Sequence, residues 1–215
     1  MNGWGGKREG AGRPRGKQTV LAHRPRPAHQ ARQPVHVTWR MVRGLPSLRT
    51  RSLSGVVGRT IRAITQSHRS RGTSFRILHF SIQPDHLHLL VEAETKQALT
   101  AGLRGLAIWI ARRVNAERGT RGRLFAERYH ARPITTARQM RTAIVYVLQN
   151  HTHHTPSRHL VDEHSSGPWF NGWERPLPSP PTPSPVSAPT TRLATAWRRY
   201  GPISFDEEPA PKPLF

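Results

Sequence analysis

The sequence predicts an α+β protein: a ferredoxin-like split β-α-β core with an antiparallel sheet, and an added C-terminal helix that carries a tyrosine. Segments that alternate like strands and segments with helical periodicity follow one another in the order β-α-β-β-α-β-α, from about residue 34 to 151. Outside these limits the apolar residues are not periodic, which predicts flexible tails. The 215 residues suit one domain of this size with such flanking regions.

The first half of the core begins with a strand and a helix. Residues 35–40 are rich in strand-forming residues and alternate, which predicts a strand. Apolar residues then recur at helical spacing from Leu53 to Ile64, among arginines that predict a basic outer face, and Gly72 ends this helix. Residues 75–82 and 86–92 predict two more strands, joined by a turn at Pro84 and Asp85.

The second half repeats a helix, an extended segment and a helix. Thr95 is the expected N-cap of a long helix, whose apolar positions are Leu99, Leu103, Leu106, Ile108, Ile110 and Val114. Residues 124–134 follow two glycines and predict an extended segment. Thr136 is the expected N-cap of the last helix, which carries Met140, Ala143, Ile144, Val147 and Leu148 on its apolar positions.

The charge balance points to a polyanionic partner. Lys and Arg number 34 and Asp and Glu 12, a formal net charge of +22, so nucleic acid is the expected partner. The absence of cysteine excludes disulfides, thiol catalysis and Cys-ligated zinc or iron–sulfur sites. No apolar run is long enough for a membrane span, and the N-terminus lacks the apolar region of a secretory signal. We therefore expect a cytoplasmic protein that binds nucleic acid and does not bind membranes.

Three regions differ in composition. Residues 1–33 hold eight Lys or Arg against Glu9, and we expect a flexible basic arm that binds phosphates, with Arg24 and Arg26 as candidate DNA-binding residues. Residues 34–154 form the predicted domain. Residues 155–215 form a Pro-rich tail with eight prolines between positions 168 and 189, which we expect not to be packed. Its aromatic islands at 169–173 and 197–200 are expected to dock on the domain rather than stack on unpaired bases.

The tripeptide His86-Leu87-His88 is the main candidate for chemistry. Side chains alternate along a strand, so both imidazoles face one side, about 7 Å apart, and can converge on one metal ion. Tyr146 and Asn150 are four residues apart and share one face of the last helix. A metal would polarise a phosphate oxygen while the phenol attacks phosphorus. The surrounding arginines, candidates for DNA binding, include Arg123, Arg128 and Arg132. Because the chain has 13 histidines, the alternative that this His-x-His pair arose by chance and binds no metal also stays open.

These residues resemble the HUH endonucleases, and in particular the single-tyrosine transposases of the insertion-sequence 200/605 type and their REP-associated branch. The resemblance rests on His86-Leu87-His88 with its flanking residues 81–92, and on residues 122–132 and 146–150. It implies cleavage and rejoining of single-stranded DNA near a hairpin through a 5′-phosphotyrosine. It also implies Tyr146 as nucleophile, and Mg²⁺ or Mn²⁺ held by His86, His88 and Asn150. Asn150 replaces a Gln that is common in relatives, and Pro84 and Asp85 replace a typical Gly-Asn. The resemblance also implies a bacterial, nucleoid-associated protein that acts either as a monomer or as a homodimer.

Two other functions compete with this interpretation. A domesticated DNA-binding protein that no longer cuts would keep the fold and the basic arm, and would need neither the histidine pair nor Tyr146. A His-ligated metal hydrolase would use His86, His88 and the histidines at 151–154, with Glu92 as a base or as an orienting partner of an imidazole. Among the tyrosines, Tyr129 lies in an Arg-dense extended segment and Tyr200 in the tail, which favours Tyr146 as nucleophile.

Overall fold

Four antiparallel strands form one sheet in the order β2-β3-β1-β4. They are β1 (Val35–Arg40), β2 (Arg76–Ile82), β3 (His86–Glu92) and β4 (His130–Pro133). The structure is a computed structural model that describes residues 28–150, 161–178, 180 and 182–209. The order of elements and the antiparallel ferredoxin-like sheet are as the sequence predicts.

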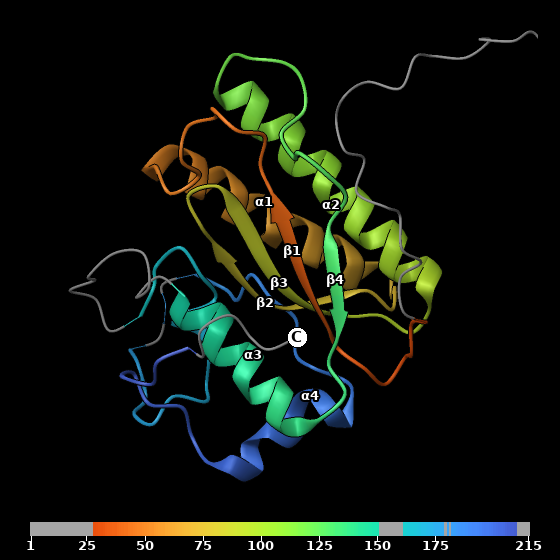
Figure 1. Cartoon of the computed structure of the whole chain (residues 1–215), viewed down its shortest axis with the longest axis vertical. Helices are drawn as coiled ribbons and strands as arrows, with labels where there is room; N and C mark the ends of the chain where they lie inside the picture. The colour runs from red at the N-terminus through yellow and green to blue at the C-terminus, as the bar shows by residue number, and fades with distance from the viewer. Residues whose placement is uncertain (1–27, 151–160, 179, 181, 210–215) are drawn as a thin grey trace, which may run out of the picture.

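Helices cover both faces of the sheet. Helices α1 (Arg51–Ser70) and α2 (Lys96–Glu117) pack on one face, and α3 (Ala137–Gln149) lies on the other, with α4 (Arg192–Ala196) beside it (Figure 1). The hydroxyls of Thr95 and Thr136 accept hydrogen bonds from the first turns of α2 and α3, so both predicted N-caps are confirmed. The expected core position Ile108 is wrong. It is 43% exposed, because it lies about 200° around the helix from Leu106.

Alternation along the strands gives the two faces of the sheet different side chains. On the face covered by α1 and α2, Trp39, Leu87 and Leu89 belong to the larger hydrophobic core. On the face toward α3, cross-strand register aligns Thr38 with His88, and His88 with Ser81. The same strands therefore supply a core on one side and a row of polar side chains on the other.

The C-terminal segment, residues 161–209, packs against α3 and the edge of the sheet. It contains two 3₁₀ helices, Gly167–Trp169 and Trp197–Tyr200. Four of its aromatic side chains are buried in the second core: Phe170, Trp173, Trp197 and Phe205. The predicted docking of the aromatic islands is confirmed. The expectation that this region is not packed is wrong for these residues, because their large aromatic rings supply enough buried area despite the prolines around them.

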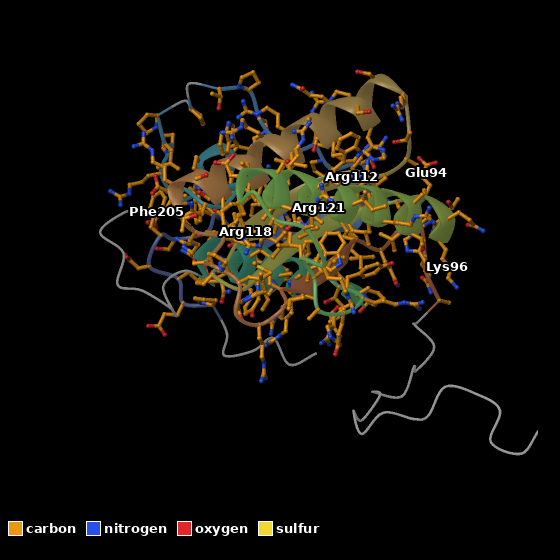
Figure 2. All side chains as sticks on the ribbon, turned by 90° about the horizontal axis from the view of Figure 1, so that it is seen from above. Glu94, Lys96, Arg112, Arg118, Arg121 and Phe205 are labelled. Atoms are coloured by element: carbon orange, nitrogen blue, oxygen red, sulfur yellow. The ribbon has the colours of Figure 1, made fainter. Side chains whose placement is uncertain are left out.

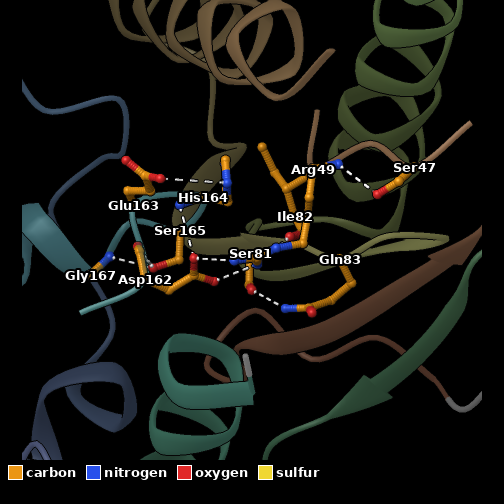
Figure 3. Close-up of polar contacts among 10 residues, drawn as sticks. All are labelled: Ser47, Arg49, Ser81, Ile82, Gln83, Asp162, Glu163, His164, Ser165 and Gly167. Carbon is orange, nitrogen blue, oxygen red and sulfur yellow. Dashed lines mark hydrogen bonds and ion pairs between the residues drawn. The ribbon is translucent and has the colours of Figure 1, made fainter. Parts of the chain in front are cut away.

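Strand β2 is an edge strand, and the C-terminal segment hydrogen-bonds along it. The amide of Ile82 donates to His164, and Phe80 and Ile77 accept from Ser166 and Ser187 at 2.7–2.9 Å. Arg49 fixes the start of this contact, because its guanidinium donates to both carboxylate oxygens of Asp162 (2.8 and 2.9 Å) and to the carbonyl of Ile82 (Figure 3). The segment is therefore part of the domain and not an appendage.

Glu92 holds the far end of this segment. Its carboxylate is 2% exposed and accepts hydrogen bonds from the backbone amides and hydroxyls of Thr190 and Thr191. The Glu92→Ala substitution removes the acceptor of four donors, so we expect the free energy of unfolding to fall by about 2–4 kcal/mol. Urea denaturation would measure this loss. The exposed neighbour Glu94 is the matched control. Equal stability of Glu92→Ala and Glu94→Ala would show that Glu92 does not stabilise the docked segment.

His79 makes the docking of the segment sensitive to pH. Its ring lies 5.3 Å from that of Phe170 and its Nδ1 is 3.3 Å from Ser166 Oγ, and burial lowers the pKa of His79 from 6.5 to about 4. Because the pKa is lower in the folded state, protonation favours unfolding. Stability is therefore full above about pH 6.5 and falls as the pH drops toward 4. We expect the melting temperature to decrease from pH 7 to 5, and less so in His79→Phe. A His130→Phe control should keep the full slope.

Candidate active site

The two imidazoles of β3 lie on the α3 face of the sheet and approach each other closely. His86 Nε2 is 2.9 Å from His88 Nε2. The opposite nitrogen of each ring has its own partner: His86 Nδ1 is 2.6 Å from Asp85 Oδ1, and His88 Nδ1 is 3.1 Å from Thr38 Oγ1. His86 and His88 thus lie on the same face of β3, as predicted. A carboxylate on Nδ1 of His86 favours the tautomer that leaves the Nε2 lone pair unprotonated.

This arrangement fits a divalent cation. Two nitrogen ligands at right angles, each about 2.1 Å from a metal, are about 3 Å apart, which is the separation of the two Nε2 atoms. Within the described residues, no group of three or more His, Cys, Asp or Glu side chains is arranged to hold a metal ion.

His36 and Thr38 lie directly behind His88. His36 Nε2 is 3.2 Å from His88 Nδ1, and its ring is buried on the same face of β1. Burial, with a smaller contribution from the charge of Arg132, lowers the pKa of His36 to about 4, so this imidazole is neutral at physiological pH. Sequence reasoning missed His36, Thr38 and Asp85 as site residues. Only Asp85 had a local signal, since it precedes His86 in the turn.

Tyr146 of α3 faces the same histidines. Its ring centroid is 5.1 Å from that of His88 and 5.7 Å from that of His36, in both cases edge to face. Burial raises the pKa of the Tyr146 phenol, and the positive charge of Arg40 acts in the opposite direction. The other two tyrosines of the chain lie elsewhere. Tyr129 packs against Trp39 in the core on the opposite face, and Tyr200 is 40% exposed.

Asn150 follows α3 directly and is 3% exposed. Its amide nitrogen is buried without a hydrogen-bond partner among the described residues. A rotation of 180° about the last side-chain bond would exchange this nitrogen for the amide oxygen, which is a metal ligand. The side chain forms no hydrogen bond with His86 or His88 within the described part of the chain, so its assignment as a ligand stays a prediction.

Residues 34–150 match the family described as "Transposase IS200 like". The chain belongs to this family. Among solved structures, one similar to this IS200-like transposase is described as the REP-associated tyrosine transposase bound to a REP hairpin (15% identity, TM-score 0.48, 62% of this chain and 74% of that chain). Another is a putative transposase from Deinococcus radiodurans R1 (16% identity, TM-score 0.40, 61% and 97%). No curated protein matches the chain.

The candidate DNA-binding arginines of the transposase lie at different places. Arg132 belongs to β4, is aligned with His36, and is close enough to lower the pKa of that imidazole. Arg123 and Arg128 are exposed in the loop before β4, where Arg123 also donates to the carbonyl of Ala126. Arg24 and Arg26 lie outside the described residues. Arg40, which the sequence did not single out, is the cation that acts on Tyr146.

The structure of the transposase corrects one part of the alternative metal-hydrolase interpretation and does not describe another. Glu92 was expected to act as a base or to orient an imidazole. Its carboxylate instead binds Thr190 and Thr191, so this expectation is wrong. The histidines at 151–154, proposed as further metal ligands, lie outside the described residues.

In the part of the chain that is described, no helix has the length and apolar character needed to cross a membrane.

Proposed function

We propose that this IS200-like transposase cleaves and rejoins single-stranded DNA next to a hairpin through a covalent 5′-phosphotyrosine on Tyr146. The observation that carries the proposal is the position of Tyr146: of the three tyrosines in the chain, it is the one whose ring contacts the rings of His36 and His88. The net charge of +22 supports a DNA partner. Membership of the family supports DNA cleavage in general.

In the proposed reaction, the Tyr146 oxygen loses its proton and attacks phosphorus. A bond forms between the tyrosine oxygen and phosphorus, the bond from phosphorus to the 3′ oxygen breaks, and that oxygen takes up a proton to leave as a 3′-hydroxyl. Arg40 favours the ionised phenol, while burial of the ring opposes ionisation in the free site. The phosphotyrosine keeps the energy of the ester, so attack by a 3′-hydroxyl can reverse the step and join strands.

The histidine pair supports metal dependence. His86 and His88 would hold Mg²⁺ or Mn²⁺ through Nε2, with Asn150 as the third protein ligand. When bound, such an ion supplies Lewis-acid stabilisation of the charge that develops on the phosphate. Asp85 and Thr38 keep the two imidazoles oriented through their Nδ1 atoms. Arg132 adds positive charge on the same face of the sheet.

Labelling the DNA at either end tests the proposal directly. The full-length protein is incubated with Mn²⁺ and a hairpin oligonucleotide that has unpaired flanks, and the products are separated on a denaturing gel. A 3′ label should move with the protein, because the tyrosine keeps the downstream 5′-phosphate, whereas a 5′ label should appear on a shorter free strand. Cleavage without an adduct would favour a metal hydrolase, and binding without cleavage would favour a domesticated DNA-binding protein.

A further inference from the structure

A basic cavity of about 810 Å³ lies between α1 and the C-terminal segment, and its lining does not include His86, His88 or Tyr146. Its floor includes Phe80 and Ile82, which belong to the core on the α1 side of the sheet. One wall is α1, and the other is formed by residues that include His164, Trp169 and Thr182. We call it the α1 groove.

The α1 wall combines arginines with glycines on one helical face. Arg51, Arg59 and Arg62 line the groove, with Gly55 and Gly58 between them, and the spacing of three, four and eight residues puts them on the same side of α1. A Cβ at Gly58 would meet nothing within 4 Å, and one at Gly55 would meet only the Arg59 guanidinium. A ligand in the groove could therefore come close to the helix backbone at these glycines, between the positively charged side chains.

The positive charge of this wall is largely uncompensated. Arg51 and Arg59 are exposed, and neither forms an ion pair with a carboxylate of the described residues. Arg62 donates one hydrogen bond to Thr182, yet its Nε is buried without a partner among the residues that the structure describes. Glu163, the acidic residue in the lining, is within 4 Å of His164. Such a set of guanidinium donors suits phosphate oxygens.

Trp169 adds a surface for a base. Its indole nitrogen donates to the carbonyl of Thr182 at 2.9 Å, which fixes the ring at the groove wall, and the side chain is half-buried. A second cavity of about 360 Å³ also includes Trp169, together with Arg69 and Arg198, so positive charge continues beyond the indole. Arginines that follow a backbone beside an aromatic ring are typical of sites for unpaired nucleic acid.

We propose that the α1 groove binds an unpaired DNA strand that flanks the hairpin, with phosphates on Arg51, Arg59 and Arg62 and a base on Trp169. The inference rests on the proposed function for the identity of the strand. The volume is in the range of small-ligand pockets, about 300–1,000 Å³, which suits a short stretch of single strand and not a duplex. The groove is separate from the cleavage site, so it would contribute affinity and not chemistry.

Two matched double variants test the groove in the full-length protein. Arg51→Ala with Arg59→Ala removes two exposed charges from the groove. Arg104→Ala with Arg112→Ala removes two exposed charges from α2, and Arg112 is labelled in Figure 2. Fluorescence anisotropy with a labelled hairpin bearing an unpaired flank should show at least about tenfold weaker binding for the groove pair only. Its slope of log affinity against log salt should fall by about 1.4, or 0.7 per lost phosphate contact.

Three further measurements separate the possible results. A hairpin without the flank should bind wild type and groove variant equally, and the groove variant should still form the covalent adduct at saturating DNA. Trp169→Leu should weaken binding without a change in the salt slope. Equal losses in the α2 pair, an equal loss with the flankless hairpin, or tighter binding of an RNA flank than of DNA would overturn the proposal. If the wild-type protein forms no covalent adduct but still binds the flank through the groove, the proposed function is wrong and the groove proposal still holds.

Discussion

Tyr146→Phe should abolish both the covalent adduct and strand cleavage while DNA binding stays unchanged. The substitution removes one oxygen and keeps the ring that contacts His36 and His88, so α3 should pack as before. Without that oxygen no other group at the site can form the phosphotyrosine, and we expect a loss of at least about a thousandfold in cleavage rate, the scale reported for catalytic groups that act directly on the bond. Gel analysis of adduct and product, with anisotropy for binding, measures both effects.

Tyr129→Phe is the matched control for this experiment. Tyr129 packs against Trp39 on the opposite face of the sheet, so its variant should form the adduct at the wild-type rate. An adduct that persists in Tyr146→Phe and disappears in Tyr129→Phe would move the nucleophile to Tyr129. Cleavage that persists in Tyr146→Phe without any adduct would instead indicate attack by water.

His88→Ala should abolish cleavage and leave DNA affinity within about twofold of wild type. A ligand of the metal stabilises charge in the transition state, whereas DNA affinity is distributed over many phosphate contacts. Thr38→Val tests the same site more gently. It removes the hydroxyl 3.1 Å from His88 Nδ1, and loss of such an orienting partner typically costs 10–100-fold in metal affinity. The Mn²⁺ concentration for half-maximal cleavage should rise accordingly in Thr38→Val.

The exposed His130 of β4 provides the control for these variants. His130→Ala removes an imidazole from the same sheet but should cleave at the wild-type rate. Cleavage by His88→Ala at the wild-type rate would show that the histidine pair is not a metal site. An unchanged Mn²⁺ requirement in Thr38→Val would show that the tautomer of His88 is set by another group, such as His36.

Local patterns predicted the central elements closely. Strands 35–40 and 86–92 have the predicted limits, because each begins just after a proline-containing break, at Pro34 and at Pro84-Asp85. The caps Thr95 and Thr136 were predictable because threonine before an apolar repeat has a specific geometric role. The extended segment at 124–134 forms a strand only over β4, since just four of its residues are aligned with β1.

What the sequence could not predict depends on contacts between distant segments. His36 and His88 meet across 52 residues, and that contact follows from the register of β1 against β3, which no local pattern specifies. Glu92 looked available for catalysis because its partners are 98 and 99 residues away. The extent of packing in the Pro-rich region was missed because its composition shows the many prolines and not the burial of Trp173 and Trp197.

The hydrogen bonds between the C-terminal segment and β2 also decide how the sheet behaves toward other molecules. A protein shortened after residue 150, where the family match ends, would leave the outer edge of the seven-residue β2 open, with the backbone groups of Ile77, Phe80 and Ile82 unpaired. An open apolar edge is a template for strand addition from another chain. The opposite edge, β4, has four residues and includes Pro133, which has no amide to donate. Self-association of such a shortened protein would therefore reflect an uncovered sheet and not a property of the transposase core.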